Sequence, residues 1–266
     1  MRRASIAIAL CLTLAACSSA ADDEGTGGAG ASGGISGTSG GSWASTSPGP
    51  SKQQEHVLAE VTERPPRYVA DPLDRFVPMW RRLDREDPSY SLDTRNPNGE
   101  LSPMLIVDAT FDEHDELWLE VLIPIRPNGA SAWVRSEDVE VDRRRDRIEV
   151  DLSKRLLWHY RDGELVDRFK VGVGQPRFPT GTGTFYVWVT VSYDNPNQPY
   201  GIFALGLSGF SPAFNEWPGG GRMAIHGTPY ASNRGQAVSY GCVRVYNDDM
   251  ESLVDIPLGT PVLISK

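Results

Sequence analysis

The chain has 266 residues and a formal net charge of −9, and 39% of its residues are hydrophobic. This composition suits a globular protein with a flexible region. The run Arg143-Arg144-Arg145 is short and is followed at once by Asp146. An acidic chain without a longer basic run argues against nucleic acid as a partner.

Residues 1–16 have the form of a secretory signal peptide: residues 1–3 read MRR, and residues 4–16 are apolar and rich in Ala and Leu. About 13 residues is too short for a membrane-spanning helix, which needs roughly 20. Residues 14–17 (LAAC) resemble the lipobox of bacterial lipoproteins. That resemblance implies cleavage before Cys17 and lipidation of its thiol. We therefore expect an extracytoplasmic chain in the cell envelope, anchored to the membrane through Cys17.

Residues 17–60 are predicted to form a linker without regular structure. They are rich in Gly, Ser and Thr, as in the run GTGGAG at residues 25–30. Such a segment has almost no apolar side chains to bury and cannot offset the entropy lost on ordering. About 38 residues of flexible chain typically span roughly 35 Å, enough to act as a tether.

The first ordered region is expected over residues 67–142. Residues 117–122 (LWLEVL) have the pattern of a strand buried on both faces. The turn sequence RPNG at 126–129 leads to a second short strand at 132–134. A strand, a Pro-x-Gly turn and Trp-Val resemble a small bacterial SH3-like β-barrel, so we predict one here. It either contacts a partner or only supports the following domain.

The C-terminal region is also β-patterned. Residues 148–152 alternate apolar and acidic side chains, which is typical of a strand with one buried face. Asp162-Gly163 lies between β-rich runs at 156–160 and 165–173, a strong hairpin signal.

Further strands are expected at 185–189 (FYVWV) and 261–264 (PVLI). A short helix should follow Asn247, which is a plausible N-cap. The Gly- and Pro-rich stretch 193–221 is long and could form a lid. We predict a mainly β domain over 146–266 with a single short helix.

A histidine and a cysteine lie in a Gly-rich setting near the end of the chain. Residues 225–228 read IHGT and residues 239–244 read SYGCVR. A thiol with a pKa near 8.5 is only about 3% ionised at neutral pH, so it needs a base, and imidazole is the usual one. Gly241 lets the backbone approach a carbonyl, where amides around Cys242 could stabilise an oxyanion. We predict acyl transfer with Cys242 as nucleophile and His226 as proton acceptor and donor.

The cysteine count agrees with a reactive thiol. Cys11 leaves with the signal peptide and Cys17 carries the lipid, so the mature chain keeps Cys242 as its one free thiol. A lone cysteine outside the cytosol cannot form an internal disulfide. The competing interpretation, an inert buried thiol, fits a plain apolar strand better than this setting.

Three segments resemble the L,D-transpeptidase family, whose catalytic module is the YkuD domain. Residues 150–154 with the Asp162-Gly163 hairpin resemble its first strands. Residues 178–185 (FPTGTGTF) are similar to its "PTPTGTF" loop, and the two segments around His226 and Cys242 to its "HGT…SHGC(V/I)R" signature. The resemblance implies a YkuD-type β-sandwich catalytic domain.

By this resemblance the family's nucleophile falls on Cys242 and its histidine on His226. The remaining motif positions are site-shaping or oxyanion residues and one substrate-binding residue: Gly227, Ser239, Tyr240, Gly241 and Arg244. Tyr240 stands where the family usually has a second histidine. A phenol can donate a hydrogen bond but cannot act as a base near pH 7, which leaves His226 as the motif's base.

The family's activity would be the attack of the thiol on the third residue of a peptidoglycan tetrapeptide stem. A thioester forms, and a neighbouring stem's amine resolves it into a 3→3 cross-link. Water in place of the amine would give an L,D-carboxypeptidase. The resemblance implies neither metal nor cofactor, and it implies carbapenems as inhibitors. In such an envelope protein the SH3-like module could itself contact peptidoglycan.

Two other interpretations remain. Zinc needs three or four ligands, usually in close pairs, and the other histidines have the settings of surface or packing residues: His56, His114 and His159. A non-catalytic wall-binding lipoprotein would use both domains as adhesive modules. A degenerate site would support that interpretation, but both catalytic positions are filled.

Overall fold

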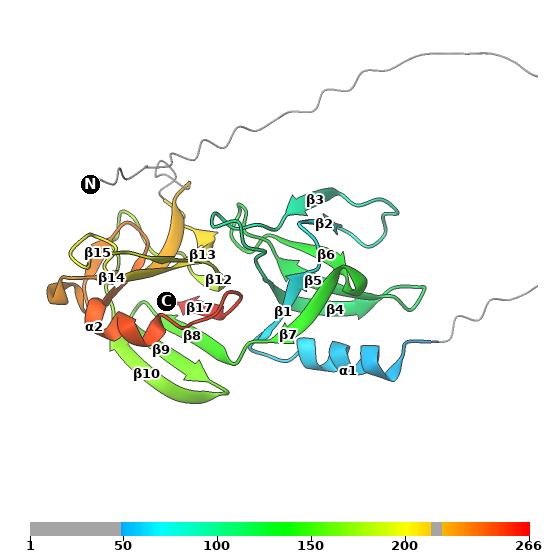
Figure 1. The fold of residues 1–266 in the computed structure, drawn as a ribbon, viewed down its shortest axis with the longest axis horizontal. Helices are drawn as coiled ribbons and strands as arrows, with labels where there is room; N and C mark the ends of the chain where they lie inside the picture. The colour runs from blue at the N-terminus through cyan, green and yellow to red at the C-terminus, as the bar shows by residue number, and fades with distance from the viewer. Residues whose placement is uncertain (1–48, 214–219) are drawn as a thin grey trace, which may run out of the picture. The chain divides into compact units, whose positions relative to one another are not determined.

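The computed structural model describes residues 49–213 and 220–266, all within the unit Thr46–Lys266 (Figure 1). The predicted signal peptide, Cys17 and the linker up to residue 48 lie outside these residues. In the described part of the chain, no helix combines the length and apolarity needed to cross a membrane.

The first helix corrects the predicted linker, because α1 (Lys52–Val61) occupies its last residues. Ser51 caps the helix: its Oγ accepts from the Gln54 amide at 3.2 Å, and its own amide donates to Gln54 Oε1 at 2.9 Å. Apolar side chains of α1 pack against the core of the first sheet, namely Val57, Leu58 and Val61. Burial of these apolar side chains orders residues 52–61. The Gly- and Ser-rich sequence upstream has few such side chains to bury.

The N-terminal sheet is five-stranded and antiparallel, in the order β6-β5-β4-β1-β7. The strands predicted at 117–122 and 132–134 are confirmed as β5 and β6. A hairpin of two further strands, β2 and β3, accompanies the sheet. The likeness to an SH3 barrel stays a prediction. The elements are β1 (Tyr68–Pro72), β2 (Phe76–Met79), β3 (Tyr90–Asp93), β4 (Met104–Phe111), β5 (Leu117–Leu122), β6 (Ser131–Arg135), η1 (Ser136–Asp138) and β7 (Val139–Arg143).

The second sheet has eight strands in the order β10-β9-β8-β17-β12-β13-β14-β16. Two neighbouring pairs are parallel, β17 with β8 and β14 with β16, and the other pairs are antiparallel. The strands are β8 (Asp146–Asp151), β9 (Leu156–Arg161), β10 (Glu164–Lys170), β12 (Gly183–Ser192), β13 (Phe203–Phe210), β14 (Arg222–Thr228), β16 (Val243–Tyr246) and β17 (Pro261–Ser265). The shorter elements are β11 (Val173–Gly174), β15 (Ala237–Ser239), η2 (Ala231–Asn233), α2 (Asn247–Met250) and η3 (Glu251–Leu253).

The mainly β fold is thus confirmed, and the hairpin turn is where it was expected. Asp162 (φ 52°) and Gly163 (φ 88°) both adopt the left-handed conformation that a two-residue hairpin turn requires. The helix prediction holds in position but not in its cap. Tyr246 is the N-cap of α2, and Asn247 is the first helical residue, whose side-chain Nδ2 donates to Pro196 O at 2.9 Å.

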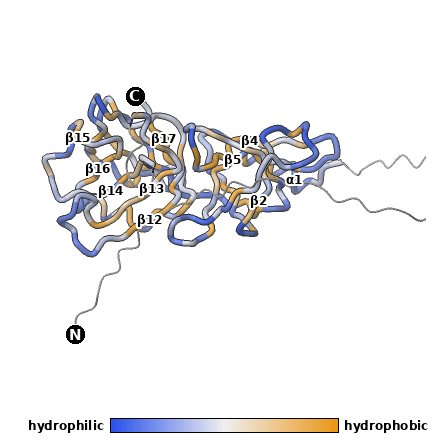
Figure 2. The backbone as a smooth tube through the Cα atoms, turned by 90° about the horizontal axis from the view of Figure 1, so that it is seen from above, coloured by the Kyte–Doolittle hydropathy of each residue, from blue (hydrophilic) through white to orange (hydrophobic). Residues whose placement is uncertain are grey.

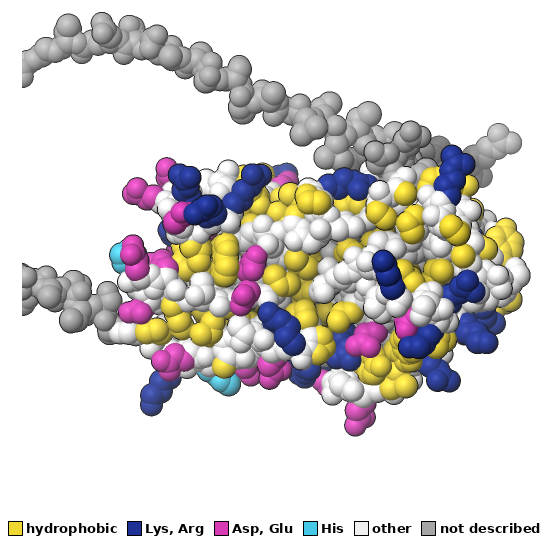
Figure 3. Space-filling model, turned by 180° about the vertical axis from the view of Figure 1, so that it is seen from behind, with side chains coloured by type: hydrophobic (Ala, Val, Ile, Leu, Met, Phe, Trp, Pro, Cys, Tyr) yellow, Lys and Arg dark blue, Asp and Glu magenta, His cyan; other side chains and the backbone are white. Residues whose placement is uncertain are grey.

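Each sheet has its own hydrophobic core, and a third cluster is shared by both sheets. Tyr186 of β12 is fully buried there against side chains of the first sheet. Hydrophobic stretches follow the strands, and hydrophilic ones follow the loops (Figure 2). On the face seen in Figure 3, acidic and basic side chains are interspersed rather than gathered into one basic patch. The members of the shared cluster are Val69, Leu105, Leu122 and Tyr186.

Candidate active site

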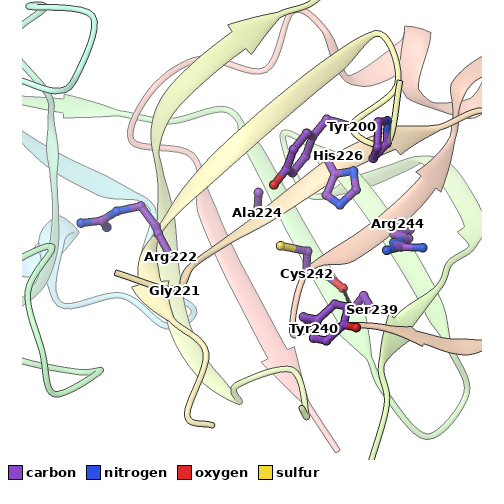
Figure 4. A pocket seen from close by; sticks show the side chains of 10 residues that line it. Tyr200, Gly221, Arg222, Ala224, His226, Ser239, Tyr240, Cys242 and Arg244 are labelled. Atoms are coloured by element: carbon purple, nitrogen blue, oxygen red, sulfur yellow. Dashed lines mark hydrogen bonds between the residues drawn. The ribbon is translucent and has the colours of Figure 1, made fainter. Parts of the chain in front are cut away.

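The parallel pair β14 and β16 brings the histidine and the cysteine together. His226 lies on β14, Cys242 immediately precedes β16, and Ile225 is in register with Val243. His226 and Cys242 line one cavity of about 240 Å³, and Figure 4 shows their side chains projecting into the same space. Its lining residues are Pro199, Tyr200, Gly221, Arg222, Ala224, His226, Ser239, Tyr240, Cys242 and Arg244.

The imidazole of His226 is oriented by a backbone carbonyl. Its Nδ1 lies 2.7 Å from Gly227 O, and because a carbonyl only accepts, Nδ1 carries the hydrogen. Nε2 is then the basic nitrogen. A glycine is needed at 227, since a Cβ there would lie 2.7 Å from Asn247 Oδ1 and 3.0 Å from Ile202 N.

His226 is 3% exposed, and burial lowers its pKa to about 4. The carbonyl of Gly227 raises the pKa, and the charge of Arg244 lowers it further, but both effects are smaller than that of burial. The imidazole is therefore neutral near pH 7 and available as a base.

This pKa makes a testable prediction about acid stability. The unfolded imidazole takes up a proton near pH 6.5, above the folded value of about 4. The stability contributed by neutral His226 is complete above the unfolded pKa and is lost as the pH falls through this window. The free energy of unfolding in urea should therefore drop more between about pH 7 and about pH 5 for the parent than for His226→Gln. Equal drops would contradict the buried neutral state.

Cys242 is half-buried, and burial raises the pKa of its thiol. The backbone of Ala224, by a hydrogen bond, and the charge of Arg244 act in the opposite direction but more weakly. A thiol with a raised pKa beside an imidazole with a lowered one is a neutral pair at rest. The proton must then move during attack on a substrate, rather than before it.

The turn before Cys242 is fixed by Ser239. Its Oγ donates to Cys242 O at 2.6 Å and accepts from the Gly241 amide at 3.1 Å. Gly241 has φ +119°, a conformation that favours glycine. Ser239 and Gly241 thus set the geometry of the turn, and their role in shaping an active site or oxyanion hole stays a prediction. Because the Gly241 amide already donates to Ser239, the Cys242 amide is the candidate oxyanion donor.

The two remaining motif residues lie at the cavity with separate partners. The Tyr240 ring is half-exposed and packs on Phe178, with 4.8 Å between ring centroids. Arg244 donates from Nη1 to Asn233 Oδ1 at 3.0 Å. The substrate-binding role of Arg244 stays a prediction.

The sequence alone did not single out Tyr200, whose ring meets the edge of the His226 ring at a centroid distance of 4.9 Å. It lies in the stretch 193–221, for which the sequence left a lid open as one possibility. The described residues of this stretch do not form a lid as a whole, because their centre is β13, whose residues are all buried. Pro199, Tyr200 and Gly221, at its two ends, do line the cavity.

His226 and Cys242 both lie in a region that matches a known protein family. Residues 145–264 match the family model of the L,D-transpeptidase catalytic domain, YkuD. "Putative L,D-transpeptidase YkuD" of Bacillus licheniformis is 35% identical over 45% of this chain and 65% of its own length. "Putative L,D-transpeptidase YqjB" of Bacillus subtilis is 31% identical over 54% of this chain and 80% of its own length.

Among solved structures, the catalytic domain from the Enterococcus faecium L,D-transpeptidase is 26% identical, with a TM-score of 0.34 over 45% of this chain and 96% of that one. Of the curated relatives, the two YkuD proteins are covered over 65% of their length and the Escherichia coli "Probable L,D-transpeptidase ErfK/SrfK" over 51%. The chain belongs to the L,D-transpeptidase family, and residues 145–264 match its catalytic domain.

Proposed function

We propose that the protein is a peptidoglycan L,D-transpeptidase that works by cysteine acyl transfer. The observation that carries this proposal is the pairing of His226 and Cys242 on adjacent parallel strands, at one open cavity. Because Nδ1 of His226 donates to the Gly227 carbonyl, Nε2 is the nitrogen that is left to act as the base. Membership of the family supplies the substrate class.

In the first half-reaction, Cys242 Sγ attacks the carbonyl of the third stem residue while His226 Nε2 takes the thiol proton. The amide of Cys242 stabilises the resulting oxyanion. The C–N bond then breaks, and the imidazolium returns its proton to the departing D-alanine amine. A thioester between the stem and Cys242 remains.

In the second half-reaction, the side-chain amine of a neighbouring stem's third residue attacks the thioester. His226 takes a proton from this amine and gives it to the departing sulfur of Cys242. An amide forms as a 3→3 cross-link, and the free thiol is restored. Arg244, one of two arginines that line the cavity together with Arg222, would hold a carboxylate of the stem.

Two alternatives differ in measurable ways. With water in place of the amine, the same site would be an L,D-carboxypeptidase. A non-catalytic wall-binding protein would not need the oriented imidazole beside a half-buried thiol, and that arrangement favours an enzyme.

Incubating the purified chain with disaccharide-tetrapeptide and analysing the products by mass spectrometry tests the proposal. A dimer lacking one D-alanine indicates cross-linking, whereas a tripeptide monomer indicates trimming. Unchanged substrate after long incubation would reject both enzymatic activities.

A lipid-anchored, extracytoplasmic location remains part of the proposal and rests on the LAAC sequence at residues 14–17. Cys17→Ser should release the protein from the membrane fraction. Unchanged retention of labelled protein there would reject the anchor.

A further inference from the structure

A turn of the N-terminal domain contacts the end of β13, beside the candidate active site. The carboxamide of Asn128, between β5 and β6, pairs with both backbone groups of Phe210 at the end of β13. Its Nδ2 donates to Phe210 O at 2.7 Å, and its Oδ1 accepts from the Phe210 amide at 2.8 Å. The side chain thus makes the hydrogen bonds that a neighbouring strand would make.

Arg126 of the same turn bridges the two described ends of the β13–β14 connection. Its Nη1 donates to Ser211 O at 3.3 Å and its Nη2 to Gly220 O at 2.8 Å. The guanidinium also lies 4.6 Å from the centre of the Phe210 ring. A planar fork with several donors suits this task, whereas an ammonium offers a single charged point.

These contacts are made next to an irregularity in the pairing of β13 with β14. The pairing of β13 with β14 is regular from Ala204 to Gly206, and it then shifts register before Phe210 meets Arg222. The pairing resumes at the end of β13, where the Ser211 amide donates to Gly221 O at 2.8 Å, and the turn of the N-terminal domain adds hydrogen bonds to both backbone groups of Phe210.

The segment held in this way lies directly behind the nucleophile's turn. An added Cβ on Gly241 would come within 3.0 Å of both Cβ and Oγ of Ser211, so Ser211 backs onto Gly241. Gly241 precedes Cys242, whose amide is the candidate oxyanion donor. On the other side of the connection, Gly221 and Arg222 line the cavity.

We propose that Arg126 and Asn128 are positioning residues of the active site. They hold Ser211 against Gly241 and so set the direction of the Cys242 amide. This inference rests on the proposed acyl transfer and makes the N-terminal domain part of the catalytic apparatus. Losing this support misplaces the oxyanion donor, whereas β16, which begins at the residue after Cys242, still holds the thiol at the cavity. We therefore expect kcat to fall more than KM rises.

The test compares Asn128→Ala with Asn98→Ala in the full chain. Asn98 is a matched control, because it also belongs to the N-terminal domain and donates to a carbonyl of the second sheet, Thr190 O at 3.0 Å, away from the cavity. For release of D-alanine from disaccharide-tetrapeptide, we expect kcat of Asn128→Ala to fall by about tenfold to a hundredfold. KM should stay within about threefold for both variants, and Asn98→Ala should keep the parental kcat.

Alkylation of Cys242 by iodoacetamide distinguishes positioning from general damage, because this displacement builds no oxyanion. Its rate should be the same in parent and Asn128→Ala. If alkylation slows as much as acylation, or if Asn98→Ala loses as much activity, the positioning role is rejected.

Arg126→Lys keeps the charge but replaces the two separate Nη donors of the planar fork with one nitrogen on a shorter side chain. It carries the test if Asn128→Ala does not fold. A loss of kcat with parental alkylation supports the proposal, and a parental kcat overturns it. If the parent releases D-alanine and both turn variants match it, the positioning role fails while the proposed function stands. If the parent releases none, the proposed function fails, and this inference falls with it.

Discussion

Cys242→Ala should abolish release of D-alanine from a tetrapeptide stem, by at least about a thousandfold, because no other group near the cavity replaces the sulfur nucleophile. The protein should stay folded, since the half-buried side chain loses only one sulfur atom. Free D-alanine, measured with a D-amino-acid oxidase assay, gives the rate, and circular dichroism confirms the fold.

The matched control is Ser211→Ala, which removes one hydroxyl beside the same turn without touching the nucleophile. Its rate should stay well above that of Cys242→Ala. Release of D-alanine by folded Cys242→Ala at the parental rate would mean that the sulfur takes no part in the reaction.

His226→Gln should slow acylation by about 10²-fold to 10⁴-fold, the usual contribution of a general base. Glutamine keeps a polar side chain at the position but cannot take up a proton at neutral pH. The loss should appear in kcat and kcat/KM alike, because proton transfer occurs in the transition state. Stopped-flow measurement of acylation separates this step from later ones.

His159→Gln provides the same substitution at a second buried histidine of the same sheet. His159 lies on β9, with its Nε2 2.7 Å from Asp146 Oδ1, and does not line the cavity. Its acylation rate on folded protein should match the parent. A loss below about tenfold in His226→Gln would assign the base to another group.

Features encoded by neighbouring residues could be predicted from the sequence. The Asp162-Gly163 turn is one, because two residues that tolerate a positive φ select a hairpin whatever packs around it. The pairing of His226 with Cys242 could be inferred as well, since the chemistry of a thiol nucleophile demands a base. Its geometric cause, the parallel alignment of β14 with β16, is visible only in the structure.

Features that depend on distant contacts could not be predicted. Helix α1 forms because a capped segment buries Val61 against a sheet that follows it in the chain. The Gly241 amide is taken by Ser239 because the turn folds back on itself. Asn128 meets Phe210 across 82 positions of sequence, with no local pattern to mark it.

The most direct test of the paired thiol and imidazole is the mass of the intact protein after mixing with a tetrapeptide stem and no acceptor amine. We expect an added mass equal to the stem minus D-alanine, located on Cys242 by peptide mapping and nearly absent in His226→Gln at the same early time. An adduct on any other residue, or one that forms equally fast without the imidazole, would contradict it.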